Sequence, residues 1–201
     1  GDSLVVGGDI GWVRVEQYGA PLMAINQGGG VFNSRVIPRK KGDAPKLRKL
    51  NAQVAKTLGM INGVTHTEFI KAHEDGKYYF LESAARVGGA NIAELVEFST
   101  GINLWREWGK LVVSQLRDEK YKLPKTKDLY GGLMMTLAKQ EYPDLSAYND
   151  DEIVWKADKE YHAGLIMVSE EYERIETLLK SSYPHPFGSF LPEKAVSRND
   201  S

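Results

Sequence analysis

The chain has 201 residues with a formal net charge of −1, and it contains 42% hydrophobic and 26% charged residues. A length of this size fits one sizeable core or two small ones, and the composition excludes a mainly disordered or collagen-like protein. The chain has no cysteine, which excludes disulfides, thiolate nucleophiles and cysteine-ligated zinc and leads us to expect a cytoplasmic protein.

The first predicted elements are the two strands of a hairpin at residues 4–6 and 12–16. Both are rich in β-branched and aromatic residues, and the glycines and aspartate at residues 7–11 between them are turn residues. Because a strand starts almost at residue 1, we expect a preceding portion to be missing from this chain. The glycine run at residues 28–30 lacks the spacing and the lysine of phosphate-binding loops and is interpreted as a mobile loop.

A helix is predicted over residues 44–58. Asp43 and Pro45 favour a helix start, and Gly59 follows the last residue of the periodic pattern. One stripe of this helix is apolar and comprises Leu47, Leu50, Val54 and Leu58. This pattern predicts an amphipathic helix that packs on a sheet.

A second hairpin is predicted from strands at residues 65–73 and 77–81, joined by the turn sequence Glu-Asp-Gly at residues 74–76. Two helices follow the hairpin. Asn91 and Glu94 resemble a capping box for the first helix, which ends at a glycine, and the second covers about residues 103–118.

The rest of the chain begins with a polar connector at residues 121–128. Strands are predicted at residues 129–138, 152–157 and 165–168, followed by a final helix that begins after Ser169. We expect the end of the chain, from residue 191 onward, to be disordered.

The register of the second hairpin decides whether two acids meet. A turn of three residues places Glu68 directly opposite Glu82, whereas a turn of two residues pairs Glu68 with Ser83 and points the acids to opposite faces. Facing carboxylates repel unless a cation lies between them, and oxygen ligands suit Mg²⁺ or Mn²⁺. The alternative is that both acids are solvated or paired with lysine. His66 shares the face of Glu68, where a hydrogen-bonding role is favoured over metal ligation.

A candidate anion pocket follows the hairpin directly. Arg86 and the pair Gly88 and Gly89 precede the helix that starts after Asn91, which places backbone N–H groups and the positive end of a helix dipole beside a guanidinium. The alternative is a plain turn, with Arg86 in a surface ion pair.

Three segments, at residues 65–69, 80–89 and 100–104, resemble the C-terminal lobe of ATP-grasp enzymes such as biotin carboxylase and the carboxylate–amine ligases. They are Thr-His-Thr-Glu-Phe, Phe-Leu-Glu-Ser-Ala-Ala-Arg-Val-Gly-Gly and Thr-Gly-Ile-Asn-Leu. The resemblance covers about residues 1–110 and is best at 60–105. It implies an enzyme that activates a carboxylate as an acyl phosphate, which an amine, a thiol or another nucleophile then attacks.

The resemblance also implies roles for single residues. Glu68 and Glu82 would bind the Mg²⁺ ions that bridge the ATP phosphates, and Arg86 would hold the transferred phosphoryl group or the acyl phosphate. Ala84 stands where the family usually has an asparagine ligand, so one metal-binding oxygen is lost. In the family the nucleotide lies between two lobes, and the phosphate-binding lysines and the adenine hinge come before the matched region. The chain alone would therefore bind ATP poorly and catalyse nothing.

We therefore expect an α+β protein with a mainly antiparallel sheet and flanking helices. Residues 1–122 would form the ATP-grasp C-terminal lobe, residues 123–190 an appended small α+β region, and residues 191–201 a flexible tail. The alternatives to a ligase half are a non-catalytic binding or regulatory module and a divalent-metal hydrolase that uses His66, Glu68 and Glu82.

The expected partners are a nucleotide, a carboxylate substrate and the missing N-terminal portion. No apolar run approaches the roughly 18 residues of a membrane span, and no basic and aromatic stripe indicates nucleic-acid binding. A homo-oligomer is left open, as are the identities of the carboxylate and the nucleophile.

Overall fold

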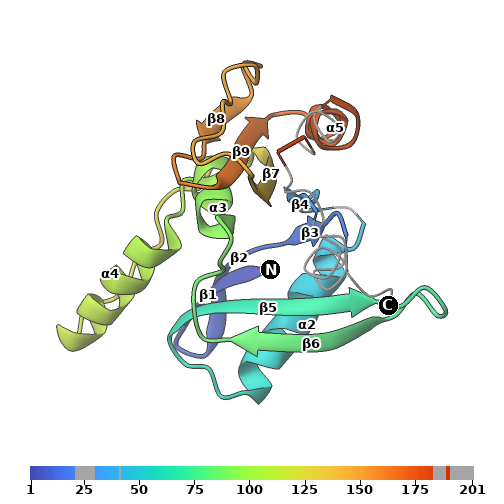
Figure 1. Cartoon of the computed structure of the whole chain (residues 1–201). Helices are drawn as coiled ribbons and strands as arrows, with labels where there is room; N and C mark the ends of the chain where they lie inside the picture. Colours follow the sequence, from blue (N-terminus) through green and yellow to red (C-terminus); the bar gives the residue numbers. More distant parts are fainter. Residues whose placement is uncertain (21–29, 41, 183–188, 191–201) are drawn as a thin grey trace, which may run out of the picture.

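The computed structural model describes residues 1–20, 30–40, 42–182 and 189–190. Most of the glycine run at 28–30 and the whole of the expected tail lie outside these residues. The described part contains two antiparallel sheets, one of four strands and one of five, with helices packed around them (Figure 1). The predicted α+β fold with antiparallel strands and flanking helices is confirmed.

The first sheet has the strand order β2-β1-β5-β6. Its strands are β1 (Asp2–Val6), β2 (Asp9–Arg14), β5 (Gly63–Lys71) and β6 (Tyr78–Ala84). The predicted N-terminal hairpin consists of β1 and β2, and its turn residues Gly7 and Gly8 have positive φ angles of 61° and 88°, which glycine adopts readily. Strand β1 also pairs with β5, so the first residues of the chain lie beside the strand that carries Glu68.

The second sheet has the strand order β3-β4-β7-β9-β8. Its strands are β3 (Glu16–Tyr18), β4 (Phe32–Val36), β7 (Tyr130–Leu137), β8 (Ile153–Lys156) and β9 (His162–Ser169). The three strands predicted after residue 128 correspond to β7, β8 and β9. Because β7 pairs with β4, this sheet crosses the domain boundary expected at residue 122.

The two sheets contribute to one hydrophobic core. The buried residues at its centre include Leu4, Trp12 and Val64 from the first sheet, Phe32, Val36, Leu133 and Ile166 from the second, and Leu95 and Val96 from the helix between them. Side chains alternate along a strand, so Asp2 shares the face of Leu4, and His66 and Glu68 share the face of Val64. These three polar side chains therefore lie on the same face of the first sheet as the core residues.

Helix α2 (Ala44–Thr57) lies on the opposite face of the first sheet, where Asn51 Nδ2 donates a hydrogen bond to Ser3 Oγ at 2.6 Å. The predicted helix is confirmed, but the residues of its predicted stripe are only partly buried, with Leu47 packed beside Val13 and Val15, and Leu58 is exposed. Its buried residues are Ala44, Asn51 and Ala55. The small alanines allow close packing, and the Asn51 hydrogen bond fixes the rotation of the helix, which leaves Leu58 62% exposed just beyond its end.

Helix α3 (Ile92–Thr100) contacts β7 and β9. The predicted capping box is wrong, because Asn91 has a left-handed φ of 61° and its side chain makes no capping hydrogen bond. A backbone turn replaces it, in which Ile92 N donates to Gly89 O at 3.0 Å. Gly101, with φ 77°, ends the helix as predicted.

Helix α4 (Leu104–Leu116) contacts β1 and β5 of the first sheet and is capped by Asn103, whose side chain accepts a hydrogen bond from Arg106 N at 2.8 Å. The final helix is α5 (Tyr172–Thr177), which continues as a π-helical turn over Leu178–Ser182. Within the part of the chain that the structure describes, no helix is long and apolar enough to span a membrane.

Candidate functional site

The two acids predicted to meet lie directly opposite each other. Glu68 on β5 pairs with Glu82 on β6, and Ala84 pairs with His66 two positions further along. Residues that pair across antiparallel strands point to the same face of the sheet. The predicted facing register of Glu68 and Glu82 is therefore confirmed.

The prediction of a three-residue turn at residues 74–76 is wrong. The hairpin loop covers residues 73–76, because Ala72 N donates to Lys77 O at 2.9 Å and Gly76 N donates to Ala72 O at 3.0 Å. This loop alone would leave the strands one residue out of the facing register. A β-bulge between Glu68 and Phe69 restores the register, because it inserts one extra residue on β6.

One oxygen of Glu68 is held by two hydrogen-bonding groups. Tyr18 OH donates to Glu68 Oε1 at 2.7 Å, and His66 Nε2 lies 3.1 Å from the same oxygen. The hydrogen bond from His66 and the one from Tyr18 outweigh the effect of burial and lower the pKa of Glu68. Glu68 is therefore ionised at neutral pH, and within the described residues its Oε2 has no hydrogen-bond partner.

His66 lies between two carboxylates. Its Nδ1 is 3.0 Å from Asp2 Oδ1 and its Nε2 faces Glu68, while only 4% of the residue is exposed. Burial alone would lower the pKa of His66, but the hydrogen bonds to Asp2 and Glu68 raise it to about 9. The protonated ring therefore donates to both acids, and neither nitrogen is free to bind a metal ion.

The hydrolase alternative is not supported by this arrangement. Across the described ranges, no group of three or more histidine and acidic side chains is placed to hold a metal ion. His66 instead has the hydrogen-bonding role that the sequence favoured for it.

Gly88 is packed against Asp2 and His66. Its N–H donates to Asp2 Oδ1 at 3.2 Å, and a Cβ on this residue would lie 2.7 Å from the same oxygen and 2.9 Å from His66 Nδ1. Such distances are too short for any side chain, so this position requires glycine. The amide of Gly88, which we expected to be free for an anion, is already occupied by Asp2.

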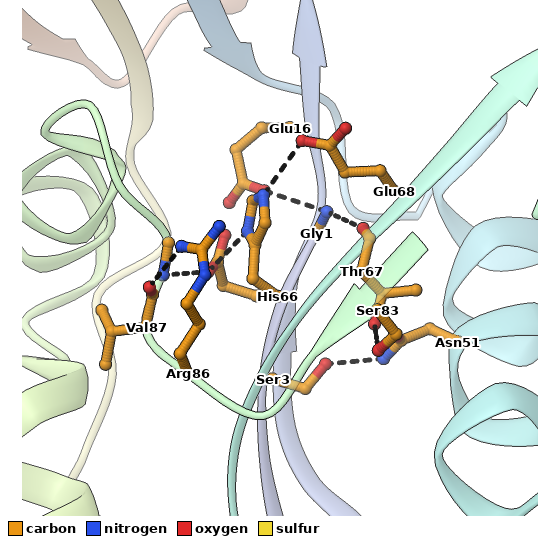
Figure 2. Close-up of polar contacts among 12 residues, drawn as sticks. Gly1, Ser3, Glu16, Asn51, His66, Thr67, Glu68, Ser83, Arg86 and Val87 are labelled. Atoms are coloured by element: carbon orange, nitrogen blue, oxygen red, sulfur yellow. Dashed lines mark hydrogen bonds and ion pairs between the residues drawn. The ribbon is translucent and has the colours of Figure 1, made fainter. Parts of the chain in front are cut away.

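Arg86 and Gly89 lie on the exposed part of the same loop. Figure 2 shows His66 between Glu68 on one side and the segment with Arg86 and Val87 on the other. Arg86 Nη1 donates to Val87 O at 3.0 Å, and among the described residues the guanidinium has no carboxylate partner. The surface ion pair considered for Arg86 is not formed there.

The side chain of Glu82 is exposed and makes no hydrogen bond or ion pair within the described residues. Together with Oε2 of Glu68, its carboxylate supplies oxygens that suit a hard divalent cation. Ala84 adds no oxygen, but Mg²⁺ usually keeps several waters and is bound by one or two carboxylates together with substrate phosphates. The residues present therefore fit Mg²⁺ or Mn²⁺.

Three residues of this network were missed from the sequence: Asp2, Tyr18 and Glu16. Asp2 is fully buried, and burial together with the charge of Asp2 raises the pKa of Glu16 to about 7. The available signal was an acid at an inward position of a strand, since buried acids are rare unless they are paired. Its partner His66 lies 64 residues away, where no local pattern connects the two.

No protein-family model matches the chain, and no curated protein matches it. Solved structures do match. Phosphoribosylglycinamide synthetase from Anaerococcus prevotii has a TM-score of 0.58 and 17% identity, over 89% of this chain and 49% of that one. L-amino acid ligase from Bacillus licheniformis has a TM-score of 0.63 and 17% identity, over 95% of this chain and 50% of that one.

The biotin carboxylase domain of a single-chain bacterial carboxylase also matches, with a TM-score of 0.50 and 10% identity, over 85% of this chain and 42% of that domain. Likeness at these identities shows the fold. The chain therefore has the fold of ATP-grasp enzymes, as the sequence resemblance implied, and it spans about half the length of these structures.

Proposed function

We propose that this chain is the ATP- and Mg²⁺-binding half of an ATP-grasp ligase. Glu68 and Glu82 would bind Mg²⁺ or Mn²⁺, and Arg86, beside Gly88 and Gly89, would bind the transferred phosphoryl group. The observation that carries this proposal is the pairing of two acids across β5 and β6, next to an arginine without an acidic partner in the described residues.

This arrangement supplies what phosphoryl transfer requires. The reaction depends on neutralising the charge of the transferred group and on placing the reactants in line. Bound Mg²⁺ would neutralise charge on the phosphates. Glu68 and Glu82 would hold it in place, and the planar guanidinium of Arg86 can bind a phosphoryl group through two parallel hydrogen bonds.

The substrate in this proposal is a carboxylate, activated as an acyl phosphate and then attacked by a nucleophile. One similar structure is named as an L-amino acid ligase, so amino acids and amines are the first compounds to test. Because the chain spans about half of the similar structures, we propose that the remaining portion of the enzyme supplies the other side of the nucleotide site.

The test is phosphate release from ATP by the complete enzyme that contains this chain, measured with Mg²⁺ over a panel of carboxylates and amines. We expect substrate-dependent release that falls at least a hundredfold in Glu82→Gln and in Glu68→Gln. Glu74→Gln, an acid in the loop of the same hairpin, is the matched control and should leave the rate unchanged. Equal, substrate-independent turnover in all four proteins would refute the ligase assignment.

A non-catalytic binding or regulatory module is the second candidate, and Ala84 is the observation that favours it. Ala84 lies opposite His66, where it adds no oxygen to the site. This alternative predicts that the complete protein has no carboxylate-dependent phosphate release and gains no protection from ATP in limited proteolysis.

A further inference from the structure

Asp2 connects three segments that are far apart in the sequence. Its Oδ1 accepts from Gly88 N at 3.2 Å and lies 3.0 Å from His66 Nδ1, and His66 in turn lies 3.1 Å from Glu68 Oε1. Strand β1, strand β5 and the loop before α3 therefore meet at a single carboxylate oxygen.

This connection is shielded from water. Asp2 is fully buried and His66 is 4% exposed, so water cannot compete for their hydrogen bonds. Charged hydrogen bonds in a buried, low-dielectric place are stronger than those at a surface. The close approach of Gly88, which leaves no room for a Cβ, shows that the loop is packed directly on the pair.

We infer that Asp2 and His66 are positioning residues that hold the Glu68 carboxylate and the Arg86–Gly89 loop in fixed relation to each other. This inference rests on the proposed function, since it concerns the metal and phosphate site named there. The anchored Oε1 leaves Oε2 of Glu68 for the cation. The bond from Gly88 to Asp2 fixes the loop two residues after Arg86.

The expected effect of losing the pair is large. Groups that hydrogen-bond to metal ligands orient them, and their removal typically weakens metal binding by about tenfold to a hundredfold. Without His66, Tyr18 would be the one remaining hydrogen-bond donor to Glu68 Oε1 among the described residues. Without Asp2, both the histidine and the loop would lose their common acceptor.

The test is the Mn²⁺ affinity of the complete enzyme that contains this chain, measured by electron paramagnetic resonance in the presence of a non-hydrolysable ATP analogue. We expect Asp2→Ala and His66→Gln to raise the Kd for Mn²⁺ by about tenfold. Gly88→Ala changes no charge but displaces the pair from the loop side, and it should weaken binding to a similar extent. Protection of the Gly88 amide from hydrogen exchange should also fall in Asp2→Ala, because its acceptor is removed.

Thr67→Val is the matched control. Thr67 lies between His66 and Glu68 on the same strand, is 2% exposed, and its Oγ1 lies 2.8 Å from Ser83 Oγ on the other face of the sheet. This variant loses a partly buried hydrogen bond between the same two strands. It should lower stability while changing the Kd for Mn²⁺ by less than twofold, which separates positioning from a general loss of stability.

The outcomes distinguish the inference from the proposed function. If Glu68→Gln and Glu82→Gln lose Mn²⁺ binding while His66→Gln and Gly88→Ala bind like the parent enzyme, the inference is overturned and the metal site remains. If the parent enzyme binds no Mn²⁺ in the presence of the ATP analogue, or if neither glutamate variant affects binding, both fail. Should Asp2→Ala not fold, His66→Gln and Gly88→Ala decide the same question.

Discussion

The charge balance around His66 depends on one buried imidazolium between the carboxylates of Asp2 and Glu68. The hydrogen bonds that hold this ring stabilise its protonated form in the folded state. In the unfolded chain the ring has an ordinary pKa near 6.5. The folded state therefore binds a proton more tightly, and stability is linked to pH through this residue.

The first prediction is a loss of stability at alkaline pH. His66 has a folded pKa of about 9, so its contribution is present below pH 6.5 and is lost as the pH rises through 9. Between pH 7 and 9.5 we expect the free energy of unfolding in urea to fall by about 2 kcal/mol. His66→Gln should flatten this slope. Stability that is constant or rises over this range would contradict the account.

A second prediction at this scale concerns Glu107, which is fully buried on α4. Its carboxylate accepts from Lys110 at 2.9 Å and from Tyr121 at 2.8 Å, which ties the segment after the helix to α4. Glu107→Ala should lower the free energy of unfolding by about 2 kcal/mol, because both donors lose a charged acceptor. Lys110→Ala, which removes one of the exposed partners and leaves Arg106 and Tyr121, should cost less than half as much in the same urea titration.

At the scale of elements, local patterns predicted helices and strands well but missed how they are oriented. The helix at residues 44–58 was expected to bury its leucine and valine stripe, yet the most buried residues are Ala44, Asn51 and Ala55, and Asn51 bonds to Ser3, while the stripe is only partly buried. The capping box failed at Asn91 for a related reason, since its left-handed backbone excludes the capping geometry. The orientation of the helix and the backbone conformation of Asn91 both depend on tertiary contacts, which a short stretch of sequence does not show.

The orientation of α2 predicts that a substitution at Ala55 costs more stability than one at Leu58. The leucine and valine stripe predicted from the sequence would give the opposite order. Ala55 is 5% exposed and Leu58 is 62% exposed. We expect Ala55→Leu to destabilise the protein by about 1–3 kcal/mol through overpacking against the sheet. Leu58→Lys should change stability by less than about 0.5 kcal/mol. Thermal unfolding of the two variants checks this, and the opposite order would show that the leucine stripe is the buried face.

For the hairpin that carries the two acids, the register was predicted correctly from the sequence but the turn was not. The facing pair of Glu68 and Glu82 was predicted, but from a three-residue turn that does not form. A longer loop and a bulge compensate for each other and give the same register. Turn residues indicate where a hairpin reverses, whereas a bulge is set by packing along both strands.

At the scale of the whole molecule, two sheets share one core and bring the start of the chain to the site. Strand β4, which ends at Val36, pairs with β7, which begins at Tyr130, and short-range patterns could not show this pairing. The long-range pairing of β1 with β5 likewise places Asp2 beside His66. The sequence thus predicted that Glu68 and Glu82 face each other, whereas the buried pair of Asp2 and His66 beside them becomes visible only in the fold.

The clearest test of the metal site is the position of bound Mn²⁺ in crystals of the complete enzyme that contains this chain, grown with Mn²⁺ and a non-hydrolysable ATP analogue. We predict an anomalous scattering peak between the carboxylates of Glu68 and Glu82, at about 2.0–2.2 Å from an oxygen of each. The phosphates should lie on the side of Arg86. A peak elsewhere, or fully occupied Mn²⁺ that neither acid contacts, would contradict the account.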